Sequence, residues 1–148
     1  MFDIARKGTL EKIQNSYKKN PELSNSVDDK KSSALILAGC RANVDVAFFF
    51  ANHVEDLKYN SGMETALMAA MMSGNFLLGE KLIAEKADLN QADIGRKTVL
   101  IYATFFKKSN IVHYIIDAVA SKNLKDSDGR TALANANFNK NTELLFLL

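Results

Sequence analysis

Four segments of the sequence share a pattern that returns at a nearly constant interval. They read SSALILAGCRAN, ETALMAAMMSGN, KTVLIYATFFKK and RTALANANFNKN, beginning at Ser32, Glu64, Lys97 and Arg130. In each, a hydroxyl residue is followed two places later by leucine and five places later by alanine, and successive copies are 32, 33 and 33 residues apart. Such a repeat is typical of architectures in which stacked neighbouring units bury a shared core.

Each recurring residue predicts a structural role. The hydroxyl residues stand directly before an apolar run, as helix N-caps do; they are Ser33, Thr65, Thr98 and Thr131. Leucine and alanine three residues apart share a helix face, and the small alanine allows a neighbouring helix to approach closely. A second apolar segment follows each copy, over residues 44–51, 76–84, 111–119 and 144–148. Each unit is therefore predicted to be two short antiparallel helices, and polar turns at Asp28, Asn60, Asp93 and Asp126 separate the units.

Composition limits the setting and the kind of partner. With 148 residues, 47% apolar and 24% charged, the chain is expected to fold as one globular domain. Cys40 is the only cysteine and the N-terminus has no apolar signal segment, so we expect a cytoplasmic protein without a disulfide. The net charge is +2, the lysine pairs are scattered, and no stretch could span a membrane, so neither nucleic acid nor a membrane is the expected partner.

The sequence offers no arrangement of residues for catalysis or metal binding. Cys40 lacks a base that would activate it, and we expect its thiol to line the core. One cysteine with the separated His53 and His113, both assigned to second helices, cannot form a zinc site. The DSDG segment at Asp126 lacks the spacing of a calcium loop, and no glycine-rich phosphate loop is present. We expect no enzyme activity, no metal and no cofactor.

At this point the chain resembles the ankyrin-repeat family, whose unit is written D-x-x-G-x-T-P-L-H-x-A-A, followed by a glycine turn and a second helix. DSDGRTALANA, from Asp126, and ETALMAAMMSGNFLLGEKLIAEKADLN, from Glu64, are similar to it, and FDIARKGTLEKIQ looks like an N-terminal unit. The resemblance implies an all-α ankyrin-repeat solenoid of stacked antiparallel helix pairs joined by β-turn finger loops. It implies one domain over 1–148, with a capping repeat at 1–27, repeats at 28–59, 60–92 and 93–125, and an incomplete repeat at 126–148.

The chain also departs from the family pattern. The proline and histidine that normally follow the threonine are absent from all four copies, so the hydrogen bonds between threonine and histidine cannot form. Glycine fills the turn between the two helices only at Gly8 and Gly74, and elsewhere stand Ala42, Lys107 and Lys140. Left-handed backbone would be costly there unless the turn shifts onto an asparagine such as Asn43 or Asn139.

In the family, the residues at the end of the first helix point into a concave groove that binds partners. The resemblance therefore implies groove residues Arg41, Met72, Phe105, Phe106 and Phe138, and finger-tip residues Lys31, Glu64, Lys97 and Arg130. Large apolar side chains at positions that need not be buried suggest a contact surface. The alternative is that Phe105 or Phe106 folds back into the core.

The function implied by the resemblance is non-enzymatic binding of another protein, an inhibitor being one form of it. One alternative is a bacterial immunity protein that neutralises a cognate toxin by occluding its active site, and another is a cytosolic adaptor with transient partners. The oligomeric state is left open, with a monomer as the simplest expectation. In ELLFLL, from Glu143, we expect some side chains to pack inward and the others to be exposed or covered by a partner or a second copy.

Overall fold

The protein is α-helical over the part of the chain that the structure describes. A computed structural model describes residues 1–41 and 43–148, so Ala42 lies outside the described residues. Extended pairing within these ranges is limited to isolated bridges. The predicted all-α class is thereby confirmed. The chain forms two compact units, residues 1–87 and 88–148.

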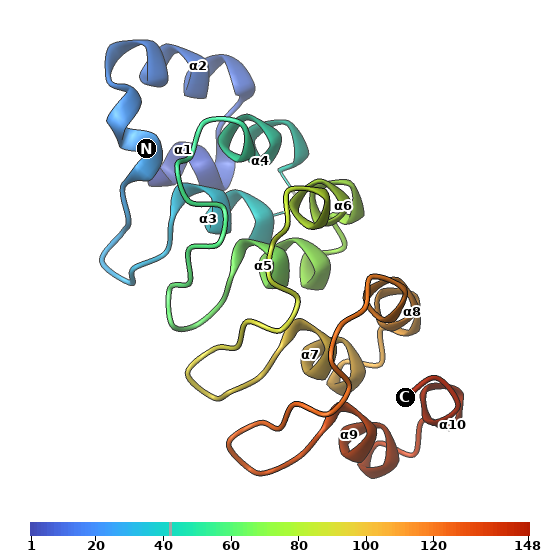
Figure 1. Cartoon of the computed structure of the whole chain (residues 1–148). Helices are drawn as coiled ribbons and strands as arrows, with labels where there is room; N and C mark the ends of the chain where they lie inside the picture. The colour runs from blue at the N-terminus through green and yellow to red at the C-terminus, as the bar shows by residue number, and fades with distance from the viewer. Residues whose placement is uncertain (42) are drawn as a thin grey trace. The chain divides into compact units, whose positions relative to one another are not determined.

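The first unit consists of three helix pairs and one 3₁₀ helix (Figure 1). Its elements are α1 (Phe2–Lys7), α2 (Leu10–Lys19), η1 (Pro21–Asn25), α3 (Ala34–Cys40), α4 (Val44–Ala51), α5 (Ala66–Ser73) and α6 (Phe76–Ala84). Helix α3 packs against both α1 and α5, while α4 packs against both α2 and α6. The first helices of the pairs therefore form one layer and the second helices another.

The second unit has two helix pairs. They are α7 (Val99–Phe105) with α8 (Ser109–Asp117), and α9 (Ala132–Phe138) with α10 (Thr142–Leu145). Helix α7 packs against α8 and α9, and α10 packs against α8 and α9. The predicted second segments at 44–51 and 76–84 coincide with α4 and α6. Helix α8 begins and ends two residues before the predicted 111–119, and α10 covers only the start of 144–148.

The four predicted N-caps all form. Each hydroxyl oxygen accepts a hydrogen bond from the backbone N–H three residues later, at 3.2 to 3.3 Å. The donors are Ile36, Met68, Ile101 and Ala134. The recurring hydroxyl thus satisfies one of the free donors in the first helical turn and fixes where α3, α5, α7 and α9 begin.

The recurring alanines mark the end of the same helices. All four are fully buried, and each carbonyl accepts the N–H of the residue five places later, which closes the helix in the manner of a Schellman motif. These pairs are Ala38 with Asn43, Ala70 with Asn75, Ala103 with Lys108, and Ala136 with Asn141. The recurring leucines are buried in α3, α5 and α7, whereas Leu133 of α9 is 45% exposed.

The turn does not shift onto asparagine. Lys107 and Lys140 take the left-handed conformation themselves, with φ of 56° and 51°, beside Gly74 at 83°. Asn43 and Asn139 keep negative φ values of −79° and −80°. The hydrogen bond to the carbonyl of the recurring alanine holds the turn in place, so lysine takes the strained left-handed conformation. Gly8 is also not left-handed, having a φ of −82° and a ψ of 171°.

Loops with one recurring geometry precede α3, α7 and α9. In each, an aspartate Oδ1 accepts the N–H of the residue four places later, at 2.7 to 2.9 Å; the aspartates are Asp28, Asp93 and Asp126. The residue three places after each aspartate has a positive φ; these residues are Lys31, Arg96 and Gly129. Before α5 the loop is shorter, and the Ser61 hydroxyl accepts from the N–H groups of Met63 and Glu64.

The C-terminal segment divides as predicted. Leu144 is fully buried, whereas the Phe146 side chain is 92% exposed. Over the described ranges, none of the helices combines the length and apolar character needed to cross a bilayer.

Candidate protein-binding surface

Three exposed aromatic side chains of the second unit lie where α7 and α9 end. Phe105 is 45% exposed, Phe106 is 53% exposed and Phe138 is 70% exposed. None of the three is a core residue, so the alternative in which Phe105 or Phe106 folds back into the core is wrong. A helix that packs on a core needs only one apolar face. In α7 this buried face is already formed by Val99, Leu100, Ile101 and Ala103, so Phe105 and Phe106 are not needed for it.

The rings on α7 support one another. The Phe106 ring lies parallel to that of Tyr102, with centroids 6.3 Å apart and planes 7° apart. It also meets Phe105 edge to face, with centroids 5.2 Å apart and planes 87° apart. The Tyr102 hydroxyl donates to Asp93 Oδ2 at 2.5 Å, which ties the stack to the loop that precedes α7. Contacts on several sides therefore limit the rotamers of these rings before any partner binds.

Helix α9 continues this surface. The Asn139 side chain donates through Nδ2 to the carbonyl of Phe105 at 3.2 Å, which places the ends of α7 and α9 side by side. The Arg130 guanidinium lies 5.4 Å from the centre of the Phe138 ring, within the range of a cation–π contact. We call the side chains of Tyr102, Phe105, Phe106 and Phe138 the aromatic surface.

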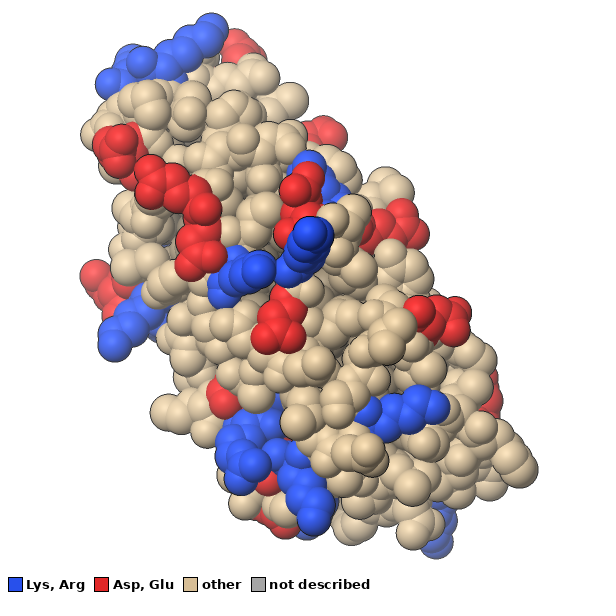
Figure 2. Space-filling view, in the orientation of Figure 1, with Lys and Arg blue, Asp and Glu red and all other residues tan. Residues whose placement is uncertain are grey.

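Basic residues accompany the aromatic surface. Arg96 and Lys97 lie in the loop whose Asp93 holds Tyr102; Lys97 is half-buried and Arg96 is exposed. Lys107 and Lys108 directly follow Phe106, and Lys140 follows Asn139; all three are exposed. Figure 2 shows Lys and Arg side chains gathered in the lower part of the view, over the loops that precede α7 and α9.

The other predicted binding residues lie in the first unit, where their environments differ. Lys31 is exposed at a loop tip, and its carbonyl accepts from the Tyr59 hydroxyl at 2.8 Å. Arg41 is exposed at the end of α3, and Met72 is half-buried in α5. Within the second unit, the structure brings together Phe105, Phe106 and Phe138 with Lys97 and Arg130.

Glu64 and Cys40 differ from expectation. The Cys40 thiol points to Glu64, with Sγ 3.3 and 3.4 Å from the two carboxylate oxygens. Cys40 is thus a surface residue and not part of the core, and Glu64 is half-buried against it instead of projecting from the loop tip. Partial burial of the sulfur, together with the negative charge of Glu64, raises the pKa of Cys40 to about 12. Burial also raises the pKa of the Glu64 carboxyl above its ordinary value. A thiol held protonated in this way is a poor nucleophile.

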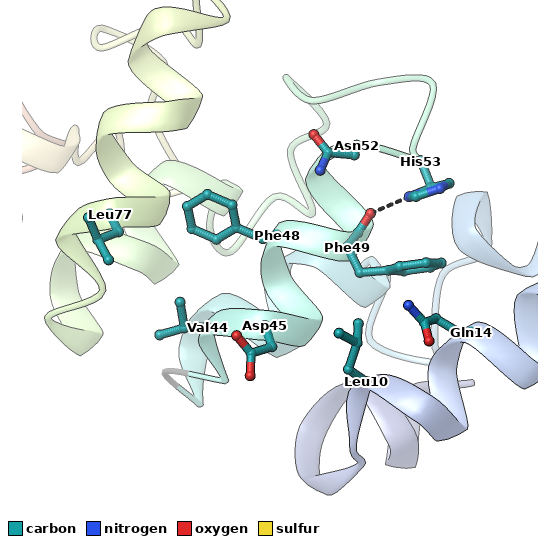
Figure 3. Close-up of a pocket in the computed structure, with 9 residues that line it drawn as sticks. All are labelled: Leu10, Gln14, Val44, Asp45, Phe48, Phe49, Asn52, His53 and Leu77. Atoms are coloured by element: carbon teal, nitrogen blue, oxygen red, sulfur yellow. Dashed lines mark hydrogen bonds between the residues drawn. The ribbon is translucent and has the colours of Figure 1, made fainter.

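The first unit also has a hollow that the sequence did not predict. It has a volume of about 490 Å³ and is formed by α2, α4, the turn after α4, and α6 (Figure 3). Its lining residues are Leu10, Gln14, Val44, Asp45, Phe48, Phe49, Asn52, His53 and Leu77. Figure 3 shows Phe48 beside Leu77 on one side and Phe49 beside His53 on the other. Most of the wall is therefore apolar, with an exposed carboxylate at Asp45.

The AFFFA segment, residues 47–51, borders this hollow and is only partly core. Phe50 and the flanking alanines are buried, while Phe48 and Phe49 are half-buried. Three consecutive residues on a helix point in directions about 100° apart, so they cannot all face the core. His53 lies just after α4, where Nδ1 donates to the Phe49 carbonyl at 2.6 Å and the ring stacks on Phe49.

The described part of the chain contains no cluster of three or more His, Cys, Asp or Glu side chains that could hold a metal ion. Comparison of the sequence with known protein families finds no matching family. Comparison with curated proteins finds no match either. The assignment of a function therefore depends on the repeat pattern and on the surfaces described above.

Proposed function

We propose that this chain is a non-enzymatic, ankyrin-repeat protein-binding module that contacts its partner through the aromatic surface. The observation that carries the proposal is the exposure of Phe105, Phe106 and Phe138 at the adjoining ends of two packed helices. Apolar side chains that gather in one exposed patch often mark an interaction site, and aromatic anchors dominate the energetics of many interfaces.

Three regularities of the backbone support the ankyrin-repeat assignment. The N-cap hydroxyls recur at the interval of the sequence repeat, the helices α3, α5, α7 and α9 each close through the carbonyl of a buried alanine, and the same aspartate loop precedes α3, α7 and α9. Helices packed in two layers within each unit agree with stacked helix pairs.

The position of the rings also supports a binding role. Tyr102 and Phe106 are restrained by stacking and by the hydrogen bond to Asp93, so little side-chain freedom remains to be lost on binding. Freezing a mobile side chain at an interface costs about 0.5–1.5 kcal/mol, and pre-ordered rings avoid much of that cost.

The test is a double substitution, Phe105→Ser with Phe106→Ser, assayed for stability and for capture of proteins from the native cell. We expect the unfolding midpoint to change little and at least one protein captured by the wild type to be lost. A matched control is Leu10→Ser with Leu77→Ser, two exposed apolar residues of the first unit. The control should retain the same protein. Equal capture by both variants would contradict the proposal.

The affinity for that protein then separates the forms of the function. An inhibitor, such as an immunity protein that occludes a toxin's active site, should bind with a Kd of about 1 nM or tighter, and a cytosolic adaptor with a Kd of about 1 µM.

A further inference from the structure

We propose that the aromatic surface recognises an acidic segment of its partner, one in which Asp or Glu residues flank two or three large apolar side chains. This inference rests on the proposed function, since it names the kind of partner for the same site. It follows from the positive charges that surround the rings and from the hydrogen bonds that neighbouring carboxylates already accept within their own loops.

The cations beside the rings are mostly free to pair with a partner. Within the described residues, no ion pair involves Arg96, Lys107, Lys108 or Lys140. Arg130 has one weak contact, 3.6 Å to Asp128, and lies over Phe138. A partner that reaches the rings therefore meets positive charge at both ends of α7 and at the start and end of α9.

Two of the acidic groups nearby are used within the loops. Asp93 accepts from the Tyr102 hydroxyl and from the N–H of Lys97. Asp126 is buried and accepts from the N–H groups of Asp128 and Arg130. These two carboxylates hold the loops in place and are poorly placed to repel an acidic ligand. Asp128 is exposed beside Arg130, but the basic side chains around the rings outnumber it, so the charge that the surface presents is positive. Charge complementarity of this kind sets partner choice and association rate.

The ring geometry favours a peptide over single-stranded nucleic acid. Base stacking needs an open ring face, whereas Phe106 has one face against Tyr102 and meets the edge-to-face Phe105. What the cluster offers instead is partly exposed rings, against which aliphatic or aromatic side chains can pack. Lysine and arginine around these rings match carboxylates on the same partner.

The experiment selects from a phage-displayed library of random 12-residue peptides on the full chain. Enriched peptides are synthesised, and their Kd values are measured by fluorescence anisotropy against wild type, Phe105→Ser/Phe106→Ser and Lys107→Glu/Lys108→Glu. The matched control is Lys18→Glu/Lys19→Glu, which reverses an exposed lysine pair of the first unit. Oligo(dT) of 12 nucleotides is measured in parallel.

We expect the enriched peptides to contain more Asp and Glu than the unselected library. The phenylalanine variant should weaken their binding at least about thirtyfold, the loss typical of removing an aromatic anchor. Reversing the charges of Lys107 and Lys108 should weaken binding about tenfold or more, whereas reversing those of Lys18 and Lys19 should weaken it less than about twofold. Raising the salt concentration should weaken the binding of the wild type.

The outcomes separate the two proposals. Peptides that need the phenylalanines but carry no excess of acid, or that ignore the charge reversal, would overturn this inference and leave the proposed function standing. Peptides that bind equally without the phenylalanines, or an absence of enriched peptides, would count against both. Tighter, phenylalanine-dependent binding of oligo(dT) than of any peptide would replace the acidic segment with nucleic acid.

Discussion

The hydroxyl of Tyr102 donates to Asp93 Oδ2 at 2.5 Å, and this bond joins helix α7 to the loop before it. The same tyrosine ring lies parallel to Phe106. Tyr102 therefore links the backbone geometry of a basic loop to an exposed aromatic ring. Loss of the hydroxyl should loosen the loop without removing the ring.

We predict that Tyr102→Phe lowers the free energy of unfolding by about 1 kcal/mol, because a hydrogen bond to a carboxylate is lost while the ring stays in place. Urea unfolding measures the change. Tyr17→Phe is the matched control, since the Tyr17 ring contacts Phe49 and His53 and should contribute through packing alone. Equal effects of the two substitutions would show that the Asp93 bond is not stabilising.

Val119 has a φ of 67° and is 85% exposed, a rare backbone conformation for a β-branched residue. We predict that Val119→Gly raises the free energy of unfolding by about 1 kcal/mol, because relief of left-handed strain exceeds the entropy that glycine loses. Val27→Gly is the control, since Val27 is also exposed but pairs in a β-bridge with Ser33. That substitution should be destabilising. A loss of stability in both variants would argue that Val119 carries no strain.

Cys40 should react slowly with alkylating reagents despite its surface position. A rise in pKa from 9.0 to about 12 removes most of the thiolate, which is the reactive form. At pH 8 we predict alkylation by iodoacetamide at least about a hundredfold slower in the native protein than in urea. Glu64→Gln should accelerate the native reaction, because it removes the charge that opposes the thiolate. Native labelling as fast as in urea would contradict this environment.

The same thiol makes stability depend on alkaline pH. Below pH 9.0 Cys40 is protonated in both states, so its contribution to stability is complete. As the pH rises from 9.0 towards about 12, the unfolded chain loses this proton before the folded chain does, and stability falls. The free energy of unfolding of the Cys40→Ala variant, measured at several pH values, should fall less steeply over this window. Identical slopes for the two proteins would rule out the contribution of the thiol.

Leu144 and Phe146 should respond oppositely to truncation. Leu144 is fully buried, so Leu144→Ala should lower the free energy of unfolding by about 2–5 kcal/mol. Phe146 is 92% exposed, and Phe146→Ala should change it by less than about 0.5 kcal/mol. Thermal unfolding of the two variants checks this order. A larger effect at Phe146 would mean that its ring is covered in solution.

Much of the local structure could be predicted because short-range chemistry determines it. Ser33 and its three counterparts cap helices because a hydroxyl before an apolar run satisfies free N–H groups whatever surrounds it. The helix that follows Asn43 begins and ends where its apolar run does. Exposure of Phe105 and Phe106 could not be predicted in the same way, since it depends on how much of α7 the neighbouring helices cover.

The errors arise where tertiary contacts override local preference. A shift of the turn onto Asn139 would have avoided strain at Lys140, but the Asn139 side chain donates to the Phe105 carbonyl and its backbone stays at a φ of −80°. Glycine is the residue best suited to left-handed backbone, yet in this loop the positive φ is at Arg96 and not at Gly95. The reason is that Asp93 Oδ1 accepts the N–H of the residue four places later, which sets the residue three places after Asp93 as the left-handed one. The environment of Cys40 could not be read from local sequence, because its partner, Glu64, lies 24 residues away in sequence.

The residues that adopt left-handed backbone have a shared composition. Within the described ranges, five of the six non-glycine residues with positive φ are basic: Lys31, Lys86, Arg96, Lys107 and Lys140. Glycine at any of these five positions would relieve strain, but it would also remove a positive charge. Three of the five, Arg96, Lys107 and Lys140, flank the aromatic surface. Replacing these basic residues with glycine should therefore trade ligand attraction for thermal resistance, and a variant selected only for a higher melting temperature should associate more slowly with an acidic partner.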